Sequence, residues 1–509
     1  MTRQPRLKGR DMGDIATGGN RLVVVSNRLP IVVKQIDDKW TYIPGSGGLV
    51  SALAPVLRDR GGIWIGWTGT VDPETPDLTE LLHDATQHSG YTLKSVQLDA
   101  KDKEDFYHGF ANEVIWPLFH DLQSHCNFAP RYWDAYCRVN RKFADVITQN
   151  ARPDDLIWVH DYHLMSVGQE LKALGISART GFFLHTPFPP LDIYMKLPWR
   201  FPLLRALLEY DLIGFQTLRD RRNFLQCIRL IAPDLTITGK GQVITIRVGN
   251  RELRVGTFPI GIDFKGFASD GKSEDVIRTA CHLHKDLPGR QILLGVDRLD
   301  YTKGICQRFE AFRNALQRFP ELHHRTTLVQ VVIPSREDIP KYHALKMEME
   351  GLVGEINGQF TQSGWVPIHY IFRSLSRTEL LAYYRACEIA LITPLKDGMN
   401  LVAKEFCAVS SEGESVLILS EFAGAAAQLQ KGALLVNPYN VEEVAEAIQR
   451  AIHMGPGERR ARMHKLKRLV REYDIFWWVD AFLKAATAKD LSNSPTPEEY
   501  VPRRETISL

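Results

Sequence analysis

The sequence predicts an α/β protein made of two doubly wound units that face each other across a cleft. Short β-branched runs alternate with longer helical patterns, which is typical of parallel sheets with helices on both faces. The chain has 509 residues. A single core rarely holds so many, so two domains of roughly 200–250 residues are expected. The alternation restarts after Pro259, which places the boundary near residues 255–265.

The first domain is expected over residues 21–259. A hairpin is predicted around Gly249-Asn250, because this pair suits a two-residue turn between strands. The runs that indicate buried parallel strands are RLVVVSN (21–27), GIWIGW (62–67), DLIWVH (155–160), TGFFLH (180–185) and DLIGFQ (211–216).

The second domain is expected over residues 260–474. Its predicted strands are QILLGV, TTLVQVVIP, IHYIF, EIALIT, SVLILS and ALLVN. Helical patterns separate them near 303–317, 336–353, 377–386, 401–410, 440–453 and 457–472. The polar stretches at 1–20 and 489–509 predict a disordered arm and a flexible tail.

Composition narrows the functional classes. The net charge of +3 provides no field that would indicate nucleic acid or membrane partners. The seven cysteines are scattered without a CxxC pair, which favours reduced thiols in a cytoplasmic protein over disulfides or a zinc site. The apolar runs are strand-sized, so no transmembrane helix is expected. The oligomeric state stays open, a homo-oligomer included.

Polar residues that follow two strands of the second domain predict a nucleotide site. Arg298 and Lys303 follow QILLGV where a helix should begin, and two cations with a helix N-terminus suit a diphosphate. After EIALIT a polar loop with Gly398 leads to a helix near Leu401, and Glu405 lies about one turn into that helix, within reach of a ribose. Solvated loop residues are the alternative for either segment alone.

The first domain carries a matching set. Arg28 follows VVVSN, and PGSGG places glycines before a helix, where backbone N–H groups can meet an anion. The run His160–His163 and the strand-end His185 suit sugar hydroxyls. A plain tight loop and a structural histidine are the alternatives. Tyr107 and Trp116 could pack in the core or line a sugar site. The motifs GxSxG, HExxH and GxxxxGK[ST] are missing, as is a cluster of metal ligands, so neither a metal nor ATP hydrolysis is expected.

Ordered motifs from about residue 21 to about 480 then identify a family. They are VVVSNRLP, GGLVSAL, WIGWTG, FYHGFAN, VIWPLFH, HDYHL, FFLHTPFP, DLIGFQT, FPIGID, DRLDYTKGI, INGQF, TPLKDGMNLVAKEF, LILSEFAGAA and VNPYN. With them the chain resembles the trehalose-6-phosphate synthases of glycosyltransferase family 20. This resemblance implies a GT-B fold, two Rossmann-like domains facing a central cleft, with a last helix at 475–488 that crosses back to the first domain.

The resemblance also implies an activity. The family transfers glucose with retention from a nucleotide-glucose, usually UDP-glucose, to glucose 6-phosphate, without a metal or cofactor, and gives α,α-trehalose 6-phosphate. ADP- or GDP-glucose stays open as donor. A separate phosphatase would act on the product. No carboxylate is an obvious nucleophile, so we expect a front-face route in which the leaving diphosphate takes the acceptor's proton.

Roles carry over residue by residue. The resemblance assigns catalysis to Arg298, Lys303, Asp161 and His185. It assigns donor binding to Gly48, Arg298, Lys303, Asp397, Gly398, Met399, Asn400, Leu401, Val402 and Glu405. It assigns acceptor binding to Arg28, Trp67, Tyr107, Trp116, Asp161, Tyr162, His163 and Arg336. His108 departs from the pattern, since Asn is frequent there.

Two other functions compete. A relative could use another phosphorylated acceptor such as glycerol 3-phosphate, as glucosylglycerol-phosphate synthases do, although SNRLP and HDYHL favour glucose 6-phosphate. The chain could instead be an inactive regulatory subunit that binds sugar phosphate. The presence of Arg298, Lys303, Asp397 and Glu405 argues against this second alternative.

Overall fold

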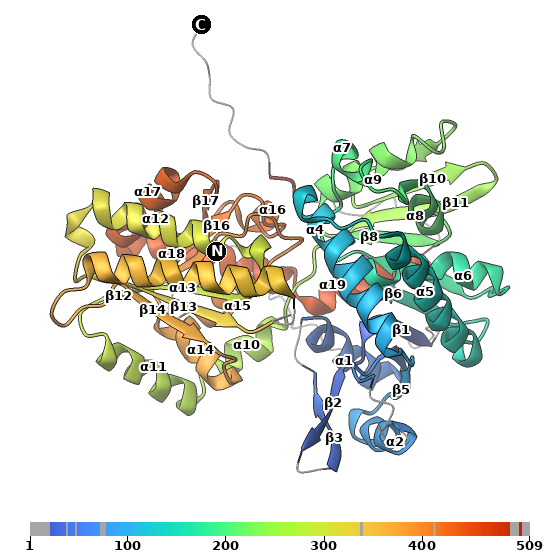
Figure 1. Cartoon of the computed structure of the whole chain (residues 1–509), viewed down its shortest axis with the longest axis horizontal. Helices are drawn as coiled ribbons and strands as arrows, with labels where there is room; N and C mark the ends of the chain where they lie inside the picture. Colours follow the sequence, from blue (N-terminus) through green and yellow to red (C-terminus); the bar gives the residue numbers. More distant parts are fainter. Residues whose placement is uncertain are drawn as a thin grey trace, which may run out of the picture.

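A computed structural model describes residues 21–36, 39–45, 48–71, 78–335, 339–410, 414–488 and 498–500. These residues form two α/β domains that lie side by side (Figure 1). The arm predicted at 1–20 lies outside the described residues, as does most of the tail predicted at 489–509.

The first sheet has nine strands in the order β5-β4-β1-β6-β7-β8-β11-β10-β9. From β5 to β11 all neighbours pair parallel, and β10 and β9 add an antiparallel edge. The predicted turn at Gly249-Asn250 joins β10 and β11. The strands are β1 (Leu22–Arg28), β4 (Gly62–Trp67), β5 (Thr92–Ser95), β6 (Leu156–His160), β7 (Arg179–Phe183), β8 (Leu212–Phe215), β9 (Thr236–Thr238), β10 (Val243–Val248) and β11 (Arg251–Thr257).

Helices cover this sheet, and a separate hairpin, β2 (Ile31–Ile36) and β3 (Lys39–Pro44), projects from it (Figure 1). In α5 (Pro130–Asn150) the buried residues recur at helical spacing, which presents one apolar face to the sheet. The other helices are α1 (Gly48–Arg60), α2 (Leu78–Ser89), α3 (Ala100–Asp102), the π-helix η2 (Lys103–Ile115), α4 (Trp116–Phe119), η3 (Gln123–His125), η4 (Tyr162–Leu164), α6 (Val167–Ala173), α7 (Leu191–Tyr194), α8 (Arg200–Leu207) and α9 (Leu218–Ile228).

The second sheet has six parallel strands in the order β14-β13-β12-β15-β16-β17. They are β12 (Gln291–Arg298), β13 (Thr326–Ile333), β14 (Ile368–Phe372), β15 (Ile389–Ile392), β16 (Val416–Ser420) and β17 (Leu434–Val436). Its helices are α10 (Phe264–Asp270), α11 (Glu274–Asp286), η5 (Tyr301–Lys303), α12 (Ile305–Arg318), η6 (Pro320–Leu322), α13 (Pro340–Phe360), α14 (Arg377–Ala386), α15 (Leu401–Val409), α16 (Ala426–Leu429), α17 (Val441–His453) and α18 (Pro456–Glu472).

Both sheets reverse their strand order at a central pair. In the first sheet the chain runs outward from β1 in one direction to β4 and β5, and in the other from β6 to β8. In the second sheet the reversal lies between β12 and β15. Because ligands of doubly wound sheets bind beyond the carboxyl ends of strands at such points, these two pairs position the site.

The last helix, α19 (Ile475–Thr487), belongs to the core of the first domain. The Phe482 ring stacks on the Trp158 ring with centroids 4.2 Å apart, and the Trp478 ring lies 4.9 Å from the Trp158 ring. Gly181 in β7 and Gly214 in β8 make room, since a Cβ at either position would lie 2.9 Å from Phe482. The absence of a side chain at these two strand positions thus lets the Phe482 ring of α19 pack directly on the sheet.

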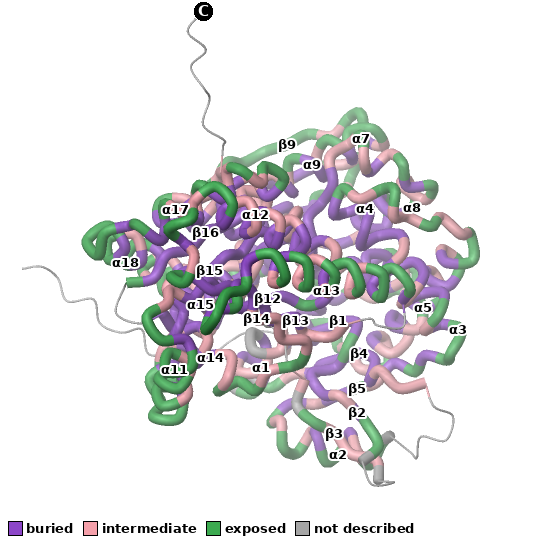
Figure 2. Tube along the Cα trace, turned by 60° about the vertical axis from the view of Figure 1, so that its left-hand side comes forward, coloured by how far each residue is buried: buried purple, intermediate pink, exposed green. Residues whose placement is uncertain are grey.

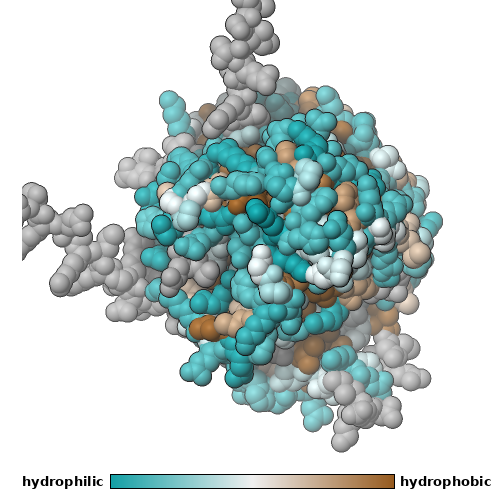
Figure 3. Space-filling view, turned by 90° about the vertical axis from the view of Figure 1, so that its left-hand side faces the viewer, coloured by the Kyte–Doolittle hydropathy of each residue, from teal (hydrophilic) through white to brown (hydrophobic). Residues whose placement is uncertain are grey.

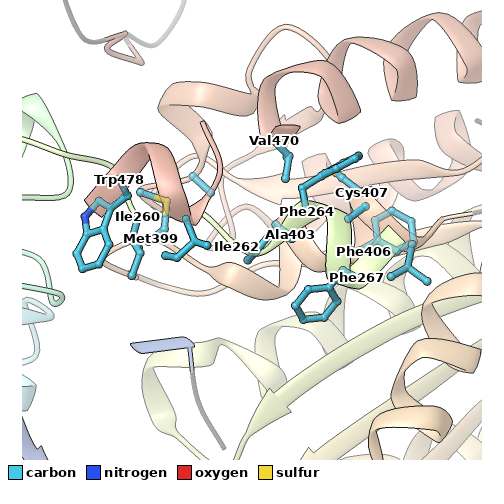
Figure 4. Close-up of a cluster of buried hydrophobic side chains, with 14 of the residues drawn as sticks. Ile260, Ile262, Phe264, Phe267, Met399, Ala403, Phe406, Cys407, Val470 and Trp478 are labelled. Atoms are coloured by element: carbon cyan, nitrogen blue, oxygen red, sulfur yellow. The ribbon is translucent and has the colours of Figure 1, made fainter. Parts of the chain in front are cut away.

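The segment between the domains is itself packed. Ile260 and Ile262 join a buried cluster with Met399 and Trp478, and Phe264 and Phe267 continue it toward α15 (Figure 4). The Ile475 N–H donates to the Ile262 carbonyl at 3.0 Å, which ties the start of α19 to the linker. The linker is therefore a buried part of the structure rather than a loose connection.

Most of the surface is polar. Figure 2 shows buried strands inside and exposed outer sides on helices such as α11 and α13, and Figure 3 shows a largely hydrophilic face on the second domain. No helix in the described part of the chain is long and apolar enough to cross a membrane. Within the predicted tail, Glu499 accepts from Arg222 of the first domain at 2.9 Å, and Tyr500 donates to Glu421 of the second at 2.8 Å.

Candidate active site

The predicted site residues gather where the two sheets face each other. Arg28 ends β1 and Asp161 follows β6, while Arg298 ends β12 and Asp397 follows β15. These four strands are the switch-point pairs of the two sheets. A pocket with about 420 Å³ of empty space lies between the domains beside Asp397, and residues of both domains line it.

Lys303 forms an ion pair with Asp397. Its Nζ donates to Asp397 Oδ2 at 2.7 Å, and both side chains are largely buried, with 13% and 15% exposed. The Lys303 cation lowers the pKa of Asp397 and keeps this carboxylate ionised. Gly304 follows with a φ of 63° and begins α12, so a left-handed residue turns the chain into the helix.

The amides expected to meet the diphosphate lie at the start of α15. Asn400 is its N-cap with an unusual φ of 84°. The Asn400 side chain accepts from the Ala403 N–H at 3.0 Å and donates to Asp397 at 3.2 Å, so it links the helix start to the carboxylate. Leu401 and Val402 open the helix, where N–H groups lack intrahelical partners. Gly48 likewise opens α1.

Gly398 brings this loop into direct contact with the first domain, and Gly424 lets another loop of the second domain pack against it. A Cβ on Gly398 would lie 2.0 Å from the His185 carbonyl oxygen, and one on Gly424 would lie 1.9 Å from the Gly398 oxygen. The Met399 side chain, expected beside the donor glucose, is only 4% exposed and packs in the linker cluster (Figure 4). Only its main chain can therefore face a ligand.

Glu405 is a buried carboxylate that contacts a tyrosine of α14. Its carboxylate accepts from the Tyr384 hydroxyl at 2.9 Å. Burial raises the pKa of Glu405, while the hydrogen bond from Tyr384 lowers it. A carboxylate held in this way can accept hydrogen bonds from a ribose.

Asp161 has an unusual backbone and an unusual acidity. It adopts a φ of 73°, and its carboxylate accepts from the His185 N–H at 3.2 Å. Burial raises the pKa of Asp161 to about 6, against the lowering effect of backbone N–H groups and of the Arg298 charge in the other domain. Strained and shifted residues in a cleft indicate a functional site.

His185 is neutral. Burial lowers its pKa to about 3. Its Nε2 lies 3.2 Å from His160 Nδ1, and its Nδ1 lies 3.4 Å from Gln216 Nε2. A histidine that stays neutral at physiological pH can position a sugar, but it cannot serve as a general acid there.

Several of the residues expected to bind the acceptor form one aromatic and cationic group. The Arg28 guanidinium lies 4.7 Å above the Trp67 ring, and burial lowers its pKa. Tyr107 contacts Trp67 edge-on at 5.8 Å and stacks on His163 at 6.0 Å. Tyr107 is half-buried and lies in η2, and π-helical geometry often marks functional segments.

The remaining predicted aromatic residues are mainly core. Trp67, Tyr162 and Trp116 are 1%, 2% and 7% exposed. Trp116 also donates to Asp300 across the domain interface at 3.4 Å, so it joins the domains as well as filling the core. Arg336 lies outside the described residues.

Sequence reasoning gave no role to several residues of the site. His120 faces Asp300, Lys303 and Asp397 of the other domain, and burial lowers its pKa to about 4. Lys396 forms an ion pair with Asp121 across the domains. The quoted motifs contain His120 and Lys396, but neither follows a strand directly, so strand-end position could not reveal them.

Comparisons with known proteins agree with this geometry. The model of "Glycosyltransferase family 20" matches residues 20–488. Trehalose-6-phosphate synthase of Mycobacterium sp. (strain JLS) is 41% identical over 477 residues, which cover 92% of this chain and 97% of the relative. The UDP-forming alpha,alpha-trehalose-phosphate synthase A of Dictyostelium discoideum is 40% identical over 91% of this chain and 62% of its own.

Solved structures show the same arrangement of domains. The UDP-forming enzyme from Burkholderia xenovorans in complex with glucose-6-phosphate superposes with a TM-score of 0.82 at 35% identity, over 92% of this chain and 100% of the other. The E. coli protein bound with UDP-2-fluoro glucose has a TM-score of 0.82 at 35% identity, over 92% and 99%. These matches confirm the predicted GT-B fold, and the chain belongs to glycosyltransferase family 20.

Proposed function

We propose that this protein is a retaining glucosyltransferase that moves glucose from UDP-glucose to glucose 6-phosphate and forms α,α-trehalose 6-phosphate. One observation carries the proposal. Cations for a leaving diphosphate, Arg298 and Lys303, follow β12 at one switch point, and Asp161 follows β6 at the other, close enough that the Arg298 charge lowers the Asp161 pKa. His185 follows the neighbouring strand β7 and donates its N–H to Asp161. Trehalose-phosphate synthases of 40–41% identity support the choice of substrates.

The chemistry follows from these positions. As the bond between the anomeric carbon and the diphosphate oxygen breaks, negative charge grows on the leaving group, and Arg298 and Lys303 stabilise it. Asp161 accepts a hydrogen bond from the attacking hydroxyl of the acceptor and orients it. That hydroxyl attacks from the face that the diphosphate leaves, and the diphosphate takes its proton, so configuration is retained.

Donor binding must rearrange one ion pair. Lys303 now pairs with Asp397, and a diphosphate in reach of Lys303 would compete with this carboxylate. Asp397, Asn400 and the α15 N-terminus would then turn toward the glucose and diphosphate. Because two protein cations serve the leaving group, we propose that no metal is needed. His185 contributes position only, since its pKa is about 3.

Arg28 selects a phosphorylated acceptor in this proposal. Its guanidinium lies over the Trp67 ring at the exposed end of β1, and the space beside it exists because residue 69 is glycine, where a Cβ would lie 2.2 Å from the guanidinium. A guanidinium fixed in this way suits a phosphate. Arg336 is its proposed partner on the acceptor phosphate.

The wider setting completes the proposal. All seven cysteines are unpaired, which suits the reducing cytoplasm. A separate phosphatase would remove phosphate from the product. The enzyme would work as a monomer or a homo-oligomer.

The test is a grid of donors and acceptors with the purified protein. UDP-, ADP- and GDP-glucose are each offered with glucose 6-phosphate, glycerol 3-phosphate and glucose, and NMR identifies the product and its anomeric configuration. We expect α,α-trehalose 6-phosphate with UDP-glucose. If glycerol 3-phosphate is the better acceptor, the function is that of a glucosylglycerol-phosphate synthase. Binding of sugar phosphate without transfer from any donor would show a regulatory protein.

A further inference from the structure

Lys404 is a buried cation next to the proposed ribose-binding Glu405. Its side chain is 1% exposed, and it points from α15 into the junction between the domains. Its Nζ donates to the Ile260 carbonyl at 2.6 Å and to the Gln428 side chain at 2.7 Å. Both acceptors are neutral, and burial lowers the Lys404 pKa to about 7. No carboxylate among the described residues pairs with this amine, and burying an unpaired amine is expensive, so packing alone does not explain Lys404.

The backbone of Ile260 connects this contact to the first domain through the two peptide groups on either side of its Cα. While its carbonyl accepts from Lys404, its N–H donates to Gln216 Oε1 at 2.9 Å. Gln216 follows β8 and is 2% exposed. A peptide N–H can only donate, so the carboxamide oxygen must face Ile260, and the NH₂ group must face His185 Nδ1, 3.4 Å away.

This orientation decides the tautomer of His185. Because Gln216 donates to Nδ1, that nitrogen must offer its lone pair. The imidazole is neutral, so its single proton lies on Nε2, where it donates to His160 Nδ1 at 3.2 Å. A connected series of contacts thus runs from Lys404 through Ile260 and Gln216 to His185.

We infer that Lys404 is a positioning residue for glucose transfer, which acts through Ile260 and Gln216 to hold the orientation and tautomer of His185. The inference rests on the proposed function, which places His185 beside the donor glucose. The same short helix would then carry Glu405 toward the ribose and fix a histidine of the opposite domain. A nucleotide that orders α15 therefore also orders the group beside the reacting sugar.

The kinetic test uses Lys404→Met, which keeps the length of the side chain and removes its donors. We expect kcat to fall ~10- to 100-fold, because a small misplacement near the reacting carbon is costly. The KM for UDP-glucose should stay within about threefold, because the ribose and diphosphate contacts remain. Lys467→Met is the matched control, since Lys467 is a half-buried lysine that donates to the Ser410 carbonyl at 2.7 Å outside this series.

A double-mutant cycle separates positioning from general damage. In a Gln216→Leu background, Lys404→Met should lower kcat less than twofold further, because the connection is already broken. If the decrease in kcat of the double variant equals the product of the two single decreases, Lys404 does not act through Gln216. Equal kinetic loss in Lys467→Met would also overturn the inference.

The tautomer is measured on ligand-free protein, so this readout does not depend on the proposed activity. Protein with ¹⁵N-labelled histidine gives ring signals for His185, assigned by their loss in His185→Asn. We expect the Nε2–H form in the wild type and a shift toward Nδ1–H in Gln216→Glu, which can only accept at that position. An Nδ1–H form in the wild type refutes the inference even if transfer is confirmed. The predicted tautomer without transfer would refute only the proposed function.

Discussion

Replacing Asp161 by Asn should stabilise the unliganded protein at neutral pH while it removes activity. Burial raises the Asp161 pKa from 3.8 to about 6. At ~1.4 kcal/mol per pKa unit, ionising this carboxyl in the native state costs about 3 kcal/mol. Asn keeps an oxygen for the His185 N–H and tolerates the φ of 73°.

The sign of the pH dependence follows from the two pKa values. Between pH 3.8 and about 6 the native state holds a proton that the unfolded state has lost, so the wild type loses stability as pH rises through this window. Above pH 6 the whole cost is present. The gain in free energy of unfolding of Asp161→Asn over the wild type should therefore be largest at pH 8, and at pH 4.5 it should be smaller by roughly 2 kcal/mol.

Thermal unfolding at both pH values measures this difference. For a domain of this size, about 2–3 kcal/mol corresponds to a Tm increase of roughly 4–10 °C at pH 8. Asp121→Asn is the control, because Asp121 also has a left-handed φ of 61° but is exposed and paired with Lys396. It should give no gain. Equal Tm shifts of Asp161→Asn at both pH values, or transfer at the wild-type rate, would refute the reasoning.

Four further outcomes are expected. Arg298→Ala or Lys303→Ala should lower kcat/KM ~100-fold, about 3 kcal/mol, because both stabilise the leaving diphosphate, and near-normal kinetics would remove that residue from the role. Transfer should persist in excess EDTA, whereas an absolute need for Mg²⁺ or Mn²⁺ would indicate a metal-bridged diphosphate. Arg28→Ala should lower kcat/KM more with glucose 6-phosphate than with glucose as acceptor, and an equal decrease with both would show that Arg28 does not bind the acceptor phosphate. Phe482→Ala should lower the free energy of unfolding, measured by chemical denaturation, by about 3–5 kcal/mol, and a decrease under 1 kcal/mol would show that α19 adds little to the stability of the first domain.

Strand periodicity was enough to predict most of both sheets. The predicted runs at 291–296 and 368–372 correspond to β12 and β14, because buried parallel strands are continuous apolar runs between helical patterns. The β2–β3 hairpin was missed, since polar residues interrupt both IVVKQI and KWTYIP and the hairpin lies outside both sheets. The π-helical form of η2 was missed too, because its wider turn leaves no signal in apolar spacing.

The site was predictable only where a side chain follows a strand. That rule found Arg28, Asp161, His185 and Arg298, because parallel strands end at the same edge of their sheet. Burial was not predictable in the same way. Met399 lies in a motif that faces the cleft, but its side chain turns into the linker cluster. The link from Lys404 to Gln216 spans 188 residues and depends on the backbone C=O and N–H of Ile260, which no side-chain pattern records.

The position of Phe482 on β7 and β8 has a consequence for biosynthesis. The first 257 residues contain every strand of the first sheet, but the rings that cover Trp158, Gly181 and Gly214 come from residues 478–482. The ribosome makes them only after the whole second domain has been synthesised. During that interval a nascent first domain presents an uncovered apolar strip on its sheet, which chaperones recognise. The core of the first domain is therefore completed only after residues 478–482 have been synthesised.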